Sequence, residues 1–190
     1  HLNHYDYRSA YARPSGDPWY GVEEDTYDSW WLGLENRLQW TPSPRWQLAG
    51  GVEGQLHFDV ETTASDESGT WLDLTGKHAT PFRVGAAYAS VDHEAAAWAR
   101  LSLGARLDSY SSFGSSLSPR AAAIFRPYEG GNLKLMAGRA FRAPSTYELN
   151  YLYNGVSPQG GSTRLRPDTI YSAEAEFTHR FSTTWSATAA

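Results

Sequence analysis

The sequence predicts an all-β protein, an antiparallel up-and-down segment of a transmembrane β-barrel. Long stretches alternate apolar and polar residues with a period of two, their connections alternate between short and long, and aromatic residues fall near their ends. Helical periodicity is nearly absent, and no apolar run approaches the roughly 20 residues that a membrane helix needs. Together these observations favour strands that cross a bilayer.

Composition narrows the class of protein further. The chain has 190 residues, a formal net charge of −5, no cysteine and an aromatic content of 14%. The negative charge argues against a nucleic-acid partner, which needs a clustered basic surface. The lack of cysteine excludes a disulfide scaffold, a cysteine-ligated zinc site and a thiol nucleophile. Because the chain begins with a histidine and no export signal follows, we expect a mature chain or a piece of a longer one.

Alternation is clearest between residues 46 and 61. One face there reads Trp46, Leu48, Gly50, Val52, Gly54, Leu56, Phe58 and Val60, and the other reads Gln47, Ala49, Gly51, Glu53, Gln55, His57, Asp59 and Glu61. We expect about nine strands on this criterion, over residues 2–11, 27–41, 46–60, 80–91, 95–108, 117–127, 132–141, 168–181 and 185 to the end. Most are longer than the about 5–6 residues of a soluble-sheet strand and suit a tilted membrane strand of about 9–11 residues.

The predicted connections agree with an outer-membrane barrel. Short connections are expected at 42–45, 92–94, 128–131 and 182–184, and longer ones at 12–26, 61–79, 109–116 and 142–167. Such barrels have brief periplasmic turns and extended outer loops. Trp30 and Trp40, which share an apolar face, would span roughly 23 Å on a tilted strand, close to the height of a lipid-facing band.

The polar faces would then line the lumen of the barrel. The residues expected to point inward are Glu53, Gln55, His57, Asp59, Arg100, Arg106, Arg120, Glu174 and Glu176. An odd number of strands is unusual for a bacterial single-chain barrel, and the last run is short. We therefore expect a segment of a larger barrel.

One segment carries a family resemblance. Residues 140–149, AFRAPSTYEL, resemble the hallmark of TonB-dependent outer-membrane receptors, and the flanking segments LSPRAAAIFRP (117–127) and LRPDTIYSAEAEF (165–177) occur in the family's order. Asp168 and Arg166 depart mildly from it, since Glu and Lys are more usual there. The residues that match the motifs are Phe141, Arg142, Ala143, Pro144, Tyr147, Glu148, Leu149, Leu165 and Pro167.

The resemblance implies a 22-stranded barrel in the outer membrane of a Gram-negative bacterium, closed by an N-terminal plug domain. Such receptors import scarce nutrients, for example a ferric siderophore or cobalamin, with energy delivered by the TonB complex. Their partners are outer-membrane lipid, the TonB complex and the small-molecule ligand. We expect residues 1–190 to be a partial barrel without the plug domain, the TonB box and the C-terminal strand.

Within the hallmark, the chemistry indicates an anchor for a loop. Pro144 removes a backbone donor and favours an extended Ala143, so the strand should end there. The planar guanidinium of Arg142 could hold carbonyls or a carboxylate of a neighbouring loop or of the plug. Ligand contact is better expected on the long loops, where the exposed candidates are Trp71, Tyr147, Tyr151, Tyr153 and Arg164.

Other kinds of chemistry find little support. Glu53, His57 and Asp59 share one predicted strand face, but a polar lumen produces such triples by chance, so no metal is expected. No serine has a nucleophile motif around it, and we expect neither an enzyme nor a cofactor. A passive porin-like barrel shares every barrel feature except the hallmark. A soluble β-sandwich that binds carbohydrate is the alternative from another class.

Overall fold

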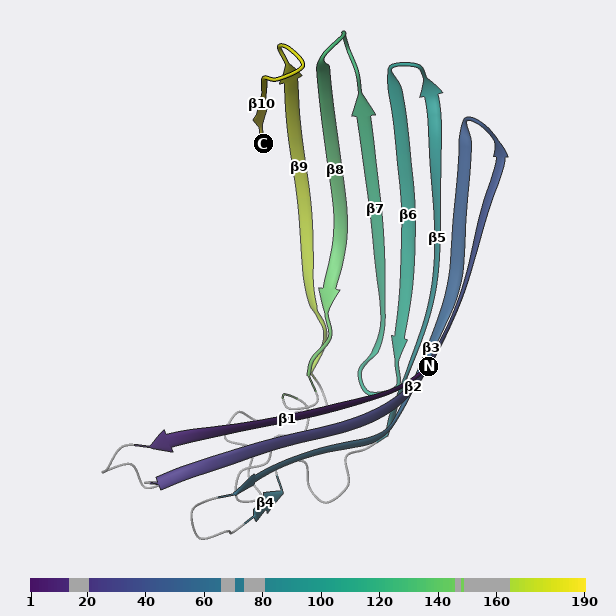
Figure 1. Cartoon of the computed structure of the whole chain (residues 1–190). Coiled ribbons are helices and arrows are strands. Elements are labelled where there is room, and N and C mark those ends of the chain that lie inside the picture. The colour runs from purple at the N-terminus through teal and green to yellow at the C-terminus, as the bar shows by residue number, and fades with distance from the viewer. Residues whose placement is uncertain (14–20, 66–70, 74–80, 146–147, 149–164) are drawn as a thin grey trace.

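The computed structural model describes residues 1–13, 21–65, 71–73, 81–145, 148 and 165–190. The described strands form a single antiparallel sheet in chain order, except that β4 pairs only with β3 (Figure 1). The strands are β1 (Leu2–Arg13), β2 (Gly21–Ser43), β3 (Trp46–Ser65), β4 (Trp71–Asp73), β5 (Phe82–Ala96), β6 (Ala99–Tyr110), β7 (Gly114–Phe125), β8 (Gly131–Arg142), β9 (Asp168–Arg180) and β10 (Ser186–Ala189).

This topology confirms the predicted all-β, up-and-down architecture. Every paired strand in the described part of the chain runs antiparallel to its neighbour. The soluble sandwich is wrong, because a sandwich needs two packed sheets and the described strands make one. Among the described residues, no helix is both long and apolar enough to cross a membrane.

The connections differ from expectation in three places. Residues 92–94, expected as a turn, lie inside β5, and the chain turns instead at Ala97 and Trp98. The long loop expected over 109–116 is only a turn at 111–113, because Tyr110 pairs with Gly114. The predicted loops 12–26 and 61–79 are partly strand. The short connections expected at 42–45, 128–131 and 182–184 are confirmed, although β2 extends to Ser43 and β8 begins at Gly131. These three turns lie at the upper end of Figure 1.

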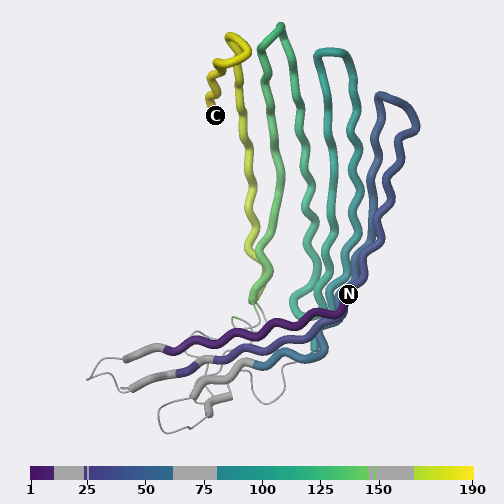
Figure 2. Tube along the Cα trace, in the orientation of Figure 1, coloured from purple at the N-terminus to yellow at the C-terminus, as the bar shows by residue number. Residues whose placement is uncertain are grey.

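The sheet bends sharply within β2 and β3 (Figure 2). Trp31 pairs with His57 while Trp30 pairs with Asp59, so Phe58 is an extra residue in β3. Such a β-bulge locally bends a strand and increases its twist, which accounts for a bend at this place. Beyond it, β1 and the adjoining parts of β2 and β3 continue away from the long strands (Figure 1).

The bulge also corrects one predicted face. Consecutive strand residues point to opposite faces, so Asp59, which pairs with Trp30, lies on the face opposite to His57, which pairs with Trp31. The expected grouping of Glu53, His57 and Asp59 on one face is therefore wrong. No group of His, Asp, Glu or Cys side chains within the described residues could hold a metal ion.

The two faces of the long strands differ in chemistry as predicted. The outer face exposes apolar side chains, among them Leu34 (76% exposed) and Leu103 (56%). The inner face carries charged groups that form ion pairs along and across the strands. Arg106 Nη2 lies 2.7 Å from Glu53 Oε2, and Arg106 Nε lies 2.8 Å from Asp108 Oδ1. Asp108 is almost fully buried. Further along the same wall, Lys134 Nζ lies 2.7 Å from Glu176 Oε1.

Candidate functional site

The hallmark segment forms the end of the β8–β9 pair that lies opposite to the short turn between β7 and β8. The ladder between these strands starts at Gly131 and His179 and ends where Arg142, the last residue of β8, pairs with Asp168, the first residue of β9. Both ends of the connection between β8 and β9 therefore meet at one place. Pro144 follows directly and donates no backbone hydrogen bond, which agrees with the predicted end of the strand.

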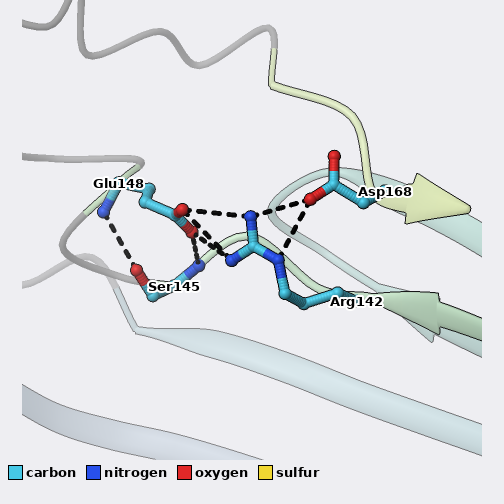
Figure 3. Close-up of polar contacts among 4 residues, drawn as sticks. All are labelled: Arg142, Ser145, Glu148 and Asp168. Carbon is cyan, nitrogen blue, oxygen red and sulfur yellow. Dashed lines mark hydrogen bonds and ion pairs between the residues drawn. The ribbon is translucent and has the colours of Figure 1, made fainter.

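Arg142 holds two carboxylates at once (Figure 3). Its Nε and Nη2 atoms donate to Asp168 Oδ2 at 3.0 and 2.8 Å. Its Nη1 atom donates to both carboxylate oxygens of Glu148, at 3.1 and 3.0 Å, and Nη2 also reaches Glu148 Oε1 at 3.1 Å. The planar fork of arginine suits this bidentate geometry, which lysine cannot reproduce. We call Arg142, Glu148 and Asp168 the strand-end clamp.

Ser145 and Glu148 form a second, local contact within the clamp. The backbone N–H of Ser145 donates to Glu148 Oε2 at 2.8 Å, and the backbone N–H of Glu148 donates to Ser145 Oγ at 3.1 Å (Figure 3). These reciprocal bonds are the capping box that the pattern Ser-x-x-Glu produces at the start of a helical turn. The box fixes the Glu148 carboxylate where Arg142 can reach it.

The electrostatics of the clamp follow from this geometry. The hydrogen bonds from Arg142, with a further one from the backbone of Ser145, lower the pKa of Glu148 to about 2. Glu148 therefore stays charged at any physiological pH and keeps its bond to Arg142. The clamp is partly exposed, with 56% of the Arg142 side chain accessible, so its role is to fix geometry more than to add large stability.

The structure brings together only some of the predicted site residues. Arg142 and Glu148 are in the clamp, and Phe141 packs edge-on against Tyr110 with ring centroids 6.1 Å apart. Ala143, Pro144 and Pro167 are half-buried beside it, and Leu165 is 37% exposed. Trp71 lies in β4 opposite Ser65. The residues outside the described part of the chain are Tyr147, Leu149, Tyr151, Tyr153 and Arg164.

Two contacts of the site were not predicted from the sequence. The spacing Ser145-x-x-Glu148 is a capping-box pattern directly after a proline, and it would have predicted both hydrogen bonds of the box. Asp168 was noted only as a departure from the usual Glu. Its direct pairing with Arg142 explains why a shorter carboxylate suffices at this position. That pairing depends on strand register, which the sequence does not reveal.

Comparison with known proteins identifies the family. The family model described as "TonB dependent receptor-like, beta-barrel" matches residues 1–190. The chain belongs to the TonB-dependent receptor family. This is an outer-membrane family of Gram-negative bacteria, and it consists of receptors rather than enzymes. Membership supports a receptor role over the porin-like barrel that the sequence left open. No curated protein matches the chain.

Solved structures of other receptors share the fold of this TonB-dependent receptor segment. The siderophore receptor PirA from Pseudomonas aeruginosa superposes with a TM-score of 0.67 at 22% identity, over 98% of this chain and 37% of that one. A variant of the ferric enterobactin receptor PfeA from Pseudomonas aeruginosa gives 0.69 at 17% identity, over 98% of this chain and 30% of that one. The copper transporter OprC gives 0.69 at 16% identity, over 95% and 32%. The chain thus spans about a third of their length.

Proposed function

We propose that this segment forms one side of the wall, and part of the extracellular mouth, of a receptor that imports a siderophore–iron complex or a similarly scarce nutrient with energy delivered through TonB. The family match over the whole chain is the observation that carries this proposal. The plug domain and the TonB box would belong to other parts of the same receptor. Its ligand would be a small molecule such as a ferric siderophore or cobalamin.

The polar inner face of the segment is consistent with a lumen that holds protein and water. Arg106 forms ion pairs with both Glu53 and Asp108 there, and Lys134 forms one with Glu176. Such a wall presents fixed hydrogen-bonding groups without a large net charge, which suits contact with a plug domain. A lipid-facing wall would be apolar instead.

The strand-end clamp supports a positioning role for the hallmark. Arg142 joins the start and the end of the connection between β8 and β9 through Glu148 and Asp168. We therefore assign the clamp to positioning that connection at the mouth. The ligand contacts that we propose lie on the outer connections, at Trp71, Tyr147, Tyr151, Tyr153 and Arg164. Loops carried on a rigid β scaffold commonly supply binding residues in this way.

The test uses the receptor that contains this segment in its own bacterium. Cells that lack the receptor gene, and complemented cells, are grown under iron limitation, and uptake of radiolabelled ferric siderophores and of cobalamin is measured with and without TonB. The proposal predicts that uptake of one of these ligands requires both the receptor and TonB. Uptake that needs the receptor but not TonB would contradict energy coupling, and would favour passive passage.

The assignment of the clamp is tested with the variant Arg142→Gln, for which Arg166→Gln is the matched control. Arg166 is exposed and has no ion-pair partner among the described residues, so its replacement changes charge without breaking an ion pair of the described part of the chain. We expect ligand affinity to fall in Arg142→Gln and to stay unchanged in Arg166→Gln. Equal affinity in both variants would show that the clamp does not contribute to ligand capture. The proposed import function would not be affected by that result.

A further inference from the structure

The outer face of the sheet holds a shallow apolar hollow of about 780 Å³. Small residues line it because Ala89 pairs with Ala105, Ala105 with Pro119, and Ala121 with Ala137 across neighbouring strands. All of these residues lie on the face that exposes Leu103, which pairs with Ala121. In a membrane-spanning wall, the hollow would therefore open toward the hydrocarbon of the bilayer.

A positive charge lies at one end of this hollow. Arg139 and its strand partner Tyr171 both line it, and Tyr171 is 77% exposed. Arg139 is near the end of β8 that carries the strand-end clamp. This inference rests on the proposed function, which puts that end at the extracellular mouth. A cation at that depth lies close to the membrane interface, where its cost is low compared with the bilayer midplane.

Arg139 is held by neutral acceptors. Its Nη1 atom donates to the backbone carbonyl oxygen of Leu117 and, at 3.3 Å, to Ser116 Oγ, and its Nη2 atom donates to Thr169 Oγ1 at 3.3 Å. The ladder of paired residues between β7 and β8 ends at Arg120 and Gly138, just before Pro119, which has no N–H to donate. The guanidinium of Arg139 thus donates a hydrogen bond to the carbonyl of Leu117, which lies beyond the end of the ladder.

Among the described residues, the charge of Arg139 has no ion-pair partner. No carboxylate in the described part of the chain contacts it, whereas carboxylates contact Arg106, Lys134 and Arg142. Arginine has five N–H donors, and the contacts above leave the Nε–H and one Nη2–H of Arg139 without a described protein partner. An uncompensated charge that borders a low-dielectric region favours a nearby anion.

We propose that the hollow and Arg139 together bind one phosphate-bearing lipid of the extracellular leaflet. An acyl chain lies along Ala105, Pro119 and Ala121, and the phosphate accepts hydrogen bonds from the free N–H groups of Arg139. Tyr171 lies beside the phosphate at the interface, where tyrosine side chains concentrate in membrane proteins. The interaction is a specific lipid site on the wall, and it is separate from ligand capture at the mouth.

The site is tested on the full receptor purified in detergent, with lipid A as the probe. Binding is followed by native mass spectrometry and by the lipid-dependent rise in unfolding temperature. The variants are Arg139→Gln, which removes the charge, Ala121→Leu, which fills the hollow, and Arg166→Gln as the control for charge outside it. The comparison probes are dephosphorylated lipid A and inorganic phosphate.

We expect lipid A affinity to fall by about tenfold or more in Arg139→Gln, to fall also in Ala121→Leu, and to be unchanged in Arg166→Gln. Dephosphorylated lipid A should bind the native receptor as weakly as lipid A binds Arg139→Gln. Equal lipid A binding by the native receptor and Ala121→Leu would show that the hollow does not bind the acyl chain, and would overturn the proposal. Displacement of lipid A by millimolar inorganic phosphate would show that Arg139 binds free anions and not specifically a lipid, which would also overturn the proposal. If Arg139→Gln does not fold, Ala121→Leu and the dephosphorylated probe still decide the question.

Discussion

Arg142 and Asp168 are a directly paired couple at the end of two strands, and the guanidinium of Arg142 donates to the same Asp168 oxygen from two nitrogens, at 2.8 and 3.0 Å. The same guanidinium also binds Glu148 of the capping box. The two ends of a long connection are therefore fixed to each other by one side chain. The clamp can be tested through its own atoms, independently of any ligand.

Loss of the Arg142 fork should loosen the capping box. In Arg142→Gln the Glu148 carboxylate loses its strongest partner, so we expect the backbone amide of Ser145 to exchange its hydrogen about fivefold faster. Hydrogen exchange measured by NMR on the detergent-solubilised receptor checks this. Asp168→Glu, which keeps the carboxylate, should retain the native rate. An unchanged Ser145 amide in Arg142→Gln would contradict the clamp.

The pH dependence of the clamp follows from Glu148. Its folded pKa of about 2 lies below the ordinary value of 4.5, so the stabilisation is fully present above pH 4.5 and is lost as the pH falls toward 2. A carboxyl-carbon NMR titration, with the Glu148 resonance assigned by its absence in Glu148→Gln, should give a midpoint near 2. A midpoint at the ordinary value would show that Arg142 does not bind this carboxylate in solution.

The sequence predicted the strands and most of their faces because alternation is a local signal. The chain from 99 to 108 alternates exposed leucines with Arg106 and Asp108, and the structure keeps that division. The turn at Ala97 and Trp98 was misplaced because it contains neither glycine nor proline, and the acidic residues before it resembled a turn. The position of this turn is set by the register between β5 and β6. That register cannot be predicted from a local sequence pattern.

The candidate site was predictable only in part. The hallmark pointed to Arg142 and Glu148, and the chemistry of arginine predicted a carboxylate partner. The bulge at Phe58 moved Asp59 to the other face, and the β8–β9 register placed Asp168 opposite Arg142. Both depend on how neighbouring strands align, and a shift of one residue would reverse every face.

The inner-wall ion pair should contribute to the stability of the barrel. Arg106→Met removes the partner of Glu53 and of the nearly buried Asp108, so we expect the free energy of unfolding to fall by about 1–3 kcal/mol. Reversible urea unfolding of the receptor in lipid measures this. The double variant Glu53→Gln with Arg106→Met should lose less than the sum of the single losses. Strict additivity would indicate that the two side chains do not interact.

The turn between β7 and β8 requires glycine at one position. Gly130 has a φ of +83°, and a Cβ built there would lie 2.7 Å from the backbone oxygen of Arg180. We expect Gly130→Ala to lower the free energy of unfolding by about 1–3 kcal/mol. Gly54→Ala is the matched control, because a Cβ there meets nothing within 4 Å. Similar losses from both substitutions would show that the turn is not built as described.

The most direct test of the whole account is the sidedness of the segment in the outer membrane. The chain contains no cysteine, so single cysteines can be introduced cleanly into a receptor that lacks any others. Arg166→Cys lies beside the strand-end clamp and Glu129→Cys lies in a short turn at the opposite end of the strands. On intact cells, a membrane-impermeant maleimide should label Arg166→Cys and leave Glu129→Cys unlabelled until the cells are broken. Labelling of Glu129→Cys alone, or of neither variant even after the cells are broken, would contradict a membrane-spanning wall with its clamp at the outer mouth.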